Sequence, residues 1–128
     1  DSGLPADKLP IVKVSESTPV TVNDAALARR LNGAIATALG SDVVVPFRQS
    51  NMGAEDFAFF VDQQFGIPGY YFAVGGTNPE WIAAAKNGGP AVAGHHSPLF
   101  KIDPEPSVRL GIEAMTAAAL DLLGTGKN

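Results

Sequence analysis

Two short runs of apolar residues, at 43–47 and 70–74, constrain the fold of this chain more than any other feature. Neither run alternates with polar residues: the first reads Val-Val-Val-Pro-Phe and the second reads Tyr-Tyr-Phe-Ala-Val. Continuous apolar runs of this length are typical of strands that are buried on both faces, as in a sheet covered by helices. The two runs therefore predict strands that need helical layers around them.

Helical signals fill the segments between and after these runs. Asn23 is a good N-cap, Asp24 suits the positive end of a helix dipole, and Gly40 is a typical helix stop. Near the C-terminus, Pro104 and Pro106 both fit the first turn of a helix. The cap of this helix would be the carboxylate before them or the one between them. Helices are expected at 24–39, at about 54–64, at 79–86, and from 103–106 to 123.

The two longer helices each carry an apolar stripe at 3.6-residue spacing, which predicts the side that faces the core. The stripe of the first consists of Leu27, Leu31, Ala34, Ile35 and Ala38. The stripe of the last consists of Val108, Ile112, Met115, Ala119 and Leu122.

The order of these elements indicates an α/β fold. Segments 11–14 and 18–22 are also strand-like, so strands and helices alternate along the chain before a final helix. Only the runs at 43–47 and 70–74 resemble buried strands, which is few for a free-standing α/β domain. We therefore expect a piece of a larger domain that packs against more sheet.

Charge and hydropathy exclude several classes of partner. The chain has 13 acidic and 9 basic residues and a net charge of −4, so it offers no electrostatic reason to bind nucleic acid or an anionic membrane. No apolar run approaches the length of a membrane span. The chain starts at Asp1 without a methionine or a signal peptide, which we interpret as a processed or cloned segment.

The absence of cysteine leaves a small chemical inventory. It excludes disulfides, thiolate nucleophiles and cysteine zinc sites, and the only two histidines are the adjacent His95 and His96. In their Gly- and Pro-containing loop, they read either as a solvated, hydrogen-bonded pair or as a pair that contains a metal ligand. Adjacent side chains on an extended loop point in different directions, so at most one of them ligates a given metal.

The spacing of the other candidate ligands does not supply a complete metal site. A catalytic zinc takes about three protein ligands. The remaining candidates are carboxylates such as Glu55, Asp56 and Asp103. No second histidine stands at a spacing that would place two imidazoles on one metal.

Two further motifs each allow a structural and a functional interpretation. Glu55 and Asp56 follow a glycine at the start of a predicted helix, so they either compensate the helix dipole or reach a cleft beyond the preceding strand. Gly75 and Gly76 follow the second apolar run, so they form either a tight turn or a point where the backbone approaches a substrate. Both interpretations stay open on the pattern alone.

Three segments in a fixed order resemble a known family. They are MGAEDFAFF at 52–60, PGYYFAVGGTNP at 68–79 and HHSPLFKIDPEPSVRLG at 95–111. Together they resemble the C-terminal part of the amidohydrolase branch of the aminoacylase and carboxypeptidase metallopeptidases, peptidase family M20, which includes hippurate hydrolases and indole-acetyl-amino-acid hydrolases. The resemblance covers roughly residues 10–123, and GAEDF followed by HSPLF is its most specific part.

The resemblance implies a fold. Members have an α/β catalytic domain, with helices packed on a mixed sheet, and a smaller inserted lid domain that often dimerises. Residues 1–18 resemble the end of the lid and the crossover from it. Residues 19–128 resemble the closing third of a zinc-peptidase-like catalytic domain.

The resemblance also implies a partial site. The histidine before Ser-Pro ligates metal in the family, which corresponds to His96, whereas His95 is not expected to ligate. Glu55 would lie near the substrate cleft, and Gly75 and Gly76 resemble a loop that lines it. The N-terminal ligand motifs of the family and its general base are absent, so no catalytic residue is assignable here. The complete enzyme would hold two divalent ions, zinc or manganese.

These implications predict a fragment of a metal-dependent amidohydrolase or peptidase that hydrolyses the amide bond of N-acyl amino acids or small peptides. In the complete enzyme a metal-bound water, activated by a glutamate, would attack the amide carbonyl. We expect the fragment to be inactive alone and the full-length protein to form a homodimer, with no nucleic-acid or membrane partner. The resemblance favours an exported or periplasmic location over the cytoplasm. The alternatives are a non-enzymatic binding or interaction module and a proteolytic fragment that makes lid or assembly contacts.

Overall fold

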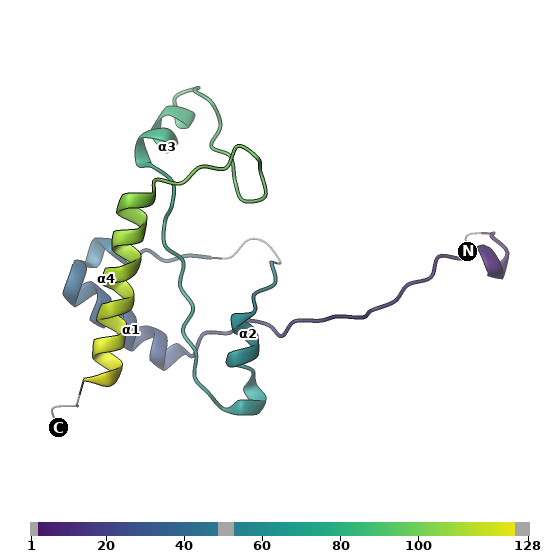
Figure 1. Cartoon of the computed structure of the whole chain (residues 1–128), viewed down its shortest axis with the longest axis horizontal. Helices are drawn as coiled ribbons and strands as arrows, with labels where there is room; N and C mark the ends of the chain where they lie inside the picture. Colours follow the sequence, from purple (N-terminus) through teal and green to yellow (C-terminus); the bar gives the residue numbers. More distant parts are fainter. Residues whose placement is uncertain (1–2, 49–52, 125–128) are drawn as a thin grey trace.

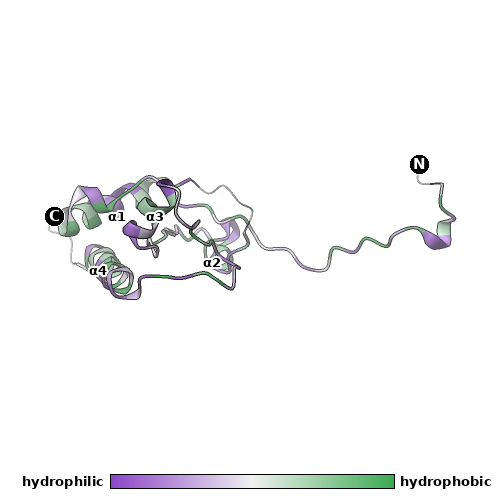
Figure 2. Ribbon diagram, turned by 90° about the horizontal axis from the view of Figure 1, so that it is seen from above, coloured by the Kyte–Doolittle hydropathy of each residue, from purple (hydrophilic) through white to green (hydrophobic). Residues whose placement is uncertain are grey.

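A computed structural model describes residues 3–48 and 53–124 of the chain, as a helical body with a long N-terminal arm (Figures 1 and 2). The arm carries a short 3-10 helix, η1 (Ala6–Lys8), and then runs without helix or strand to residue 24. The body contains α1 (Ala25–Leu39), η2 (Ser41–Val43), α2 (Phe57–Phe60), η3 (Gln63–Phe65), α3 (Pro79–Lys86) and α4 (Pro104–Leu123).

The bounds of α1 agree with the prediction, but its N-cap lies one residue after the predicted one. Asp24 is the cap: its Oδ1 accepts a hydrogen bond from the Leu27 N–H at 2.7 Å. Asn23, predicted to be the cap, instead bonds to the backbone of Tyr71. At the other end, Gly40 has φ 104°, a conformation that glycine adopts without a Cβ clash, and its N–H donates to the Ala36 carbonyl.

The predictions for α3 and α4 are confirmed. α3 begins after Asn78, whose side chain accepts from the Glu80 N–H at 2.8 Å. α4 has proline in its first turn, as predicted, but no carboxylate caps it. The Asp103 carboxylate accepts instead from the Asn78 side chain at 2.8 Å. No helix within the described residues is long and apolar enough to cross a membrane.

The helix predicted at 54–64 is much shorter in the structure. α2 ends at Phe60, and a separate 3-10 turn, η3, begins after Asp62. The Asp62 carboxylate accepts from the Gln64 N–H at 3.1 Å and so starts the new turn. Asp side chains compete in this way with the helical hydrogen-bonding pattern, which explains why the helix does not continue.

The core lies between α1 and α4, which cross in Figure 1 and contact each other. The buried residues of α1 are Leu31 and Ile35, and those of α4 are Ala114 and Ala118. Alanines on one helix let the backbones approach closely, so the larger side chains of the other fill the gap. The ion pair of Arg30 with Asp121, whose Nε and Oδ2 are 2.6 Å apart, adds a polar contact beside this core.

The predicted core stripe of α4 is wrong in this structure. α4 turns its small residues towards α1, and this orientation leaves the stripe on a different face. The exposed members of the stripe are Val108, Ile112, Met115 and Leu122. This apolar face has no covering layer among the described residues.

The mixed sheet that the sequence predicted is not formed by residues 3–48 and 53–124, since no strand occurs in them. Val43 belongs to η2, and the rest of the two apolar runs is neither helix nor strand. Within 70–74, the only backbone hydrogen bonds to described residues are those of Tyr71, and they go to the Asn23 side chain. A strand needs a neighbouring strand, and the described chain brings none alongside.

A matched pair of isoleucines tests this assignment of the core. Ile35 is 5% exposed and Ile112 is 63% exposed, and both lie within helices. In the 128-residue chain, we expect Ile35→Ala to lower the free energy of unfolding by about 3 kcal/mol and Ile112→Ala by less than about 0.5 kcal/mol. Urea denaturation followed by circular dichroism measures both. Equal losses would show that Ile112 is as buried as Ile35, and therefore that the apolar stripe of α4 is covered in the 128-residue chain.

Candidate functional site

Two consecutive turns hold the histidine pair. The Ser97 N–H donates to the Gly94 carbonyl at 3.3 Å, and the Phe100 N–H donates to the Ser97 carbonyl at 3.0 Å. His96 has φ 65° and is the only non-glycine among the described residues with a positive φ. This conformation costs an L-residue roughly 1–2 kcal/mol, although histidine is among the residues enriched there.

The two imidazoles have different surroundings. The His95 ring contacts the Phe100 ring, with centroids 4.8 Å apart and an interplanar angle of 35°. His96 is exposed and has no hydrogen bond, ion pair or ring contact to any described residue. Both histidines are exposed, and the ring that the family resemblance assigns to metal is the one without a contact to another described residue.

The Gly75–Gly76 turn is held by the first turn of α4. The Gly75 carbonyl accepts from the Ser107 hydroxyl at 2.9 Å, and the Gly76 carbonyl accepts from the Asp103 N–H at 2.7 Å. A Cβ at Gly76 would lie 3.1 Å from Cγ2 of Ile102, so a larger residue would press on this segment. Because the histidine loop leads directly into Ile102 and Asp103, the loop and the glycine turn are joined at the start of α4.

Glu55 lies just before α2, and the structure does not show the acidic pair as helix caps. The Asp56 side chain makes no cap hydrogen bond. Partial desolvation, followed by the negative charge of the nearby Glu55 carboxylate, raises the pKa of the Tyr71 phenol above its ordinary value.

The predicted site residues thus fall into two groups. Glu55 precedes α2, whose Phe57 ring contacts the Tyr71 ring, whereas Gly75 and Gly76 are joined to α4 at the end of the histidine loop. No hydrogen bond, ion pair or ring contact between described residues joins Glu55 to His96.

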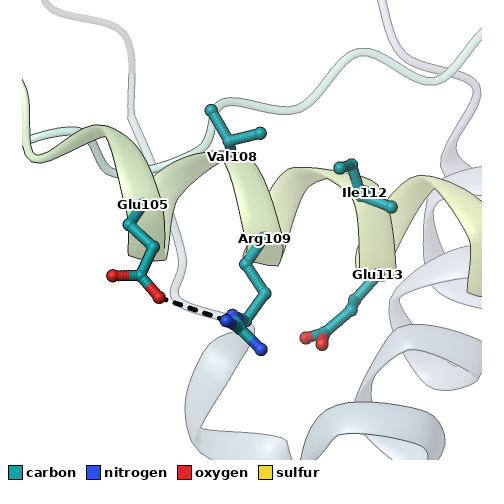
Figure 3. Close-up of a pocket in the computed structure, with 5 residues that line it drawn as sticks. All are labelled: Glu105, Val108, Arg109, Ile112 and Glu113. Atoms are coloured by element: carbon teal, nitrogen blue, oxygen red, sulfur yellow. Dashed lines mark hydrogen bonds and ion pairs between the residues drawn. The ribbon is translucent and has the colours of Figure 1, made fainter.

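Two surface depressions lie elsewhere. One, of about 770 Å³, is bordered by the root of the arm and by residues 61–69, and it contains none of the predicted site residues. The other, of about 330 Å³, lies along α4. Figure 3 shows the ion pair of Glu105 and Arg109 in one row of α4 and Val108 and Ile112 in another. Since one helix supplies every lining residue, the second depression is an exposed helix face rather than a cleft.

The described residues do not fit a complete metal centre. They contain no group of three or more His, Cys, Asp or Glu side chains that could hold a metal ion. A protein zinc site takes about four ligands, of which three or four come from the protein. A metal bound through His96 would therefore need most of its ligands from outside the described residues.

Comparison with known proteins identifies the class. Residues 8–121 match the model of peptidase family M20/M25/M40, and because the match spans most of the chain, the chain belongs to this peptidase family. This confirms the resemblance drawn from the three sequence segments. Peptidases of this family are generally metal-dependent. No individual curated protein and no solved structure gives a significant match.

Two residues beside the site were not identified from the sequence. Tyr71 was assigned to a buried strand and Asn23 to a helix cap, yet Asn23 pairs with the Tyr71 backbone and the Tyr71 ring contacts Phe57 of α2. One signal was present: Asn23 and Asp24 are consecutive cap-type residues, and only one of them can cap α1.

The backbone conformation of His96 predicts that the order of stability of glycine and alanine variants is reversed between positions 95 and 96. We expect His96→Gly to be more stable than His96→Ala by about 1 kcal/mol, because glycine adopts a positive φ without the Cβ penalty. At His95, where φ is not positive, the glycine variant should be the less stable of the two. Urea denaturation of the four variants measures this. A His96→Gly variant that is less stable than His96→Ala would contradict the assigned conformation.

Proposed function

We propose that this chain is the C-terminal piece of a metal-dependent amidohydrolase that cleaves the amide bond of N-acyl amino acids or small peptides. Membership of peptidase family M20/M25/M40 supports peptidase or hydrolase chemistry in general. The observation that carries the finer proposal is the state of His96, an exposed imidazole without a partner among the described residues and with a positive φ.

Both properties of His96 favour a ligand role. Neutral imidazole is the commonest protein ligand for metals near neutral pH. Unfavourable backbone conformations persist where the surrounding structure holds them, and they concentrate at functional sites. Here two turns and Pro98 hold the loop around His96. We assign His96 as one ligand of a centre of two divalent ions, zinc or manganese, whose other ligands come from the rest of the enzyme.

The apolar surface supports the view that the chain is part of a larger domain. The α4 stripe is exposed, and the apolar residues at 72–74 have no backbone hydrogen bond to described residues. Exposed apolar surface and unpaired extended backbone are both stabilised by further sheet. In this proposal residues 1–18 end the lid and residues 19–128 close the catalytic domain. The piece is inactive alone.

Substrate contacts are assigned to the same two groups of residues. Glu55 borders the cleft near Tyr71, and Gly75 and Gly76 line it near the histidine loop. The small N-acyl amino acid or peptide would lie between them in the complete enzyme. A homodimer formed through the lid and an exported location follow from the resemblance and belong to the proposal.

A second candidate function is a non-enzymatic binding module that retains the fold of the family. The lack of a three-residue ligand group among the described residues favours it. The two functions differ in what the encoding gene contains. A longer reading frame with the remaining metal ligands supports the enzyme, whereas a start codon near Asp1 supports the module.

The adjacent histidines provide a matched test in the longer gene product. We expect His96→Ala to remove metal from the protein and to lower turnover of N-acyl amino acids by more than about 100-fold, since even residues outside the ligand set alter metal affinity by about 10–100-fold. His95→Ala should retain both metal and turnover. Elemental analysis and a hydrolysis assay measure the two effects. Unchanged metal content and turnover in His96→Ala would exclude the proposed ligand role.

A further inference from the structure

We infer that Ser107 is a positioning residue of the proposed active site, whose hydroxyl ties the Gly75–Gly76 turn to the end of the histidine loop. The inference deepens the proposed function and rests on it for the roles of the glycine turn and of His96. It assigns work to a residue outside the predicted site. Contacts between the turn, the loop and the start of α4 carry it.

The Ser107 hydroxyl lies between two carbonyl oxygens from different parts of the chain. It donates to the Asp103 carbonyl at 2.7 Å and to the Gly75 carbonyl at 2.9 Å. The bond to Asp103 spans four residues and is of the local kind that serine often makes in a helix. The bond to Gly75 spans 32 residues, so helix formation alone does not explain it. One side chain therefore connects the first turns of α4 to the glycine turn.

Asp103, the residue before α4, is bound to the same turn by two further groups. Its N–H donates to the Gly76 carbonyl at 2.7 Å, and its carboxylate accepts from the Asn78 side chain at 2.8 Å. The Asn78 side chain also accepts from the Glu80 N–H, so the start of α3 belongs to the same network. With the bond from Ser107, the N–H, the carboxylate and the carbonyl of Asp103 are all engaged.

The glycine turn is closed on one side and open on another. A Cβ at Gly76 would lie 3.1 Å from Cγ2 of Ile102, so the turn lies close to the segment that enters α4. A Cβ at Gly75 would meet no heavy atom of the described residues within 4 Å, and Gly75 is exposed. Gly75 therefore leaves room for a substrate group to approach its backbone, while the bond from Ser107 fixes its carbonyl.

The histidine loop reaches this network as a unit that its own contacts close. The Phe100 N–H donates to the Ser97 carbonyl at 3.0 Å, and the Leu99 N–H donates to the Ser97 hydroxyl at 3.2 Å. Residues 101 and 102 alone separate Phe100 from Asp103. The position of His96 relative to the glycine turn therefore depends on how firmly Asp103 is held.

The proposed function gives this network a consequence for catalysis. A metal held by His96 and a substrate held along the glycine turn react only when they are correctly placed relative to each other. A misplacement of about 1 Å can lower the rate by about 100-fold, even when its cause lies away from the reacting atoms. Ser107 acts through the carbonyls of Gly75 and Asp103, and so it is a positioning residue rather than a catalytic one.

The absence of cysteine allows a test in the 128-residue chain that needs neither metal nor substrate. Spin labels on Ala73→Cys and Leu99→Cys, at two exposed positions, report the distance between the run before the turn and the histidine loop. In that background we expect Ser107→Ala to broaden the distance distribution measured by electron paramagnetic resonance. Ser107→Thr keeps the hydroxyl and should leave the distribution narrow.

The matched control for this measurement is Thr37→Ala. The Thr37 hydroxyl donates to the Gly33 carbonyl at 2.8 Å, which is the same four-residue bond within α1 and has no link to the glycine turn. An unchanged distribution in Ser107→Ala, or equal broadening in Ser107→Ala and Thr37→Ala, would overturn the inference.

Kinetics of the longer protein test the consequence for the reaction. We expect Ser107→Ala to lower kcat for N-acyl amino acids by about tenfold at unchanged metal content, because His96 is intact and only its placement relative to the substrate changes. Ser107→Thr should restore kcat, and Thr37→Ala should retain it. An unchanged kcat in Ser107→Ala, or a loss that Ser107→Thr does not restore, would overturn the positioning role. If the wild type hydrolyses no N-acyl amino acid, the proposed function fails, and the distance measurement decides by itself whether Ser107 ties the two segments.

Discussion

The packing of α1 on α4 is the contact on which the rest of this structure depends. These helices supply four of the five buried apolar residues of the described chain, the fifth being Ala58 of α2. Their two N-terminal ends then hold the segment that links α2 to α3. The start of α1 binds residues 69–71 through Asn23 and Asp24, and the start of α4 binds Gly75 and Gly76 through Asp103 and Ser107. The run at 70–74 is thus fixed at both ends and unpaired between them.

This arrangement places the two parts of the candidate site. Glu55 precedes α2, whose Phe57 ring contacts Tyr71 at the first end of the run, and the histidine loop leads into the second end through Asp103. The run between them carries the apolar residues that resemble a buried strand. A neighbouring strand supplied by the rest of the enzyme would pair with residues 72–74.

The helices that were predicted well are those whose ends have local causes. Asn78 with Pro79 starts α3, Pro104 starts α4, and Gly40 ends α1, and each acts on backbone within one turn. The helix at 54–64 was predicted too long because Asp62 bonds to the backbone two residues later, a competition that apolar periodicity does not reveal. The strands were not observed because pairing depends on residues far away in the sequence. The sequence proposes His96 and Glu55 as site residues, but it does not predict the pairing of Asn23 with the Tyr71 backbone.

By itself, the sequence determined the peptidase family, the places where the long helices begin and end, and the two histidines that can carry metal chemistry. These depend on residue identity and on contacts within a few residues. Only the tertiary structure decided which face of α4 is buried, since both its alanines and its larger stripe are apolar and α1 can pack closely only on the alanines. It also decided that Asn23 bonds to Tyr71 rather than capping α1, and that the Tyr71 ring contacts Phe57 of α2. Such contacts join residues that are distant in the chain, and local pattern does not specify them.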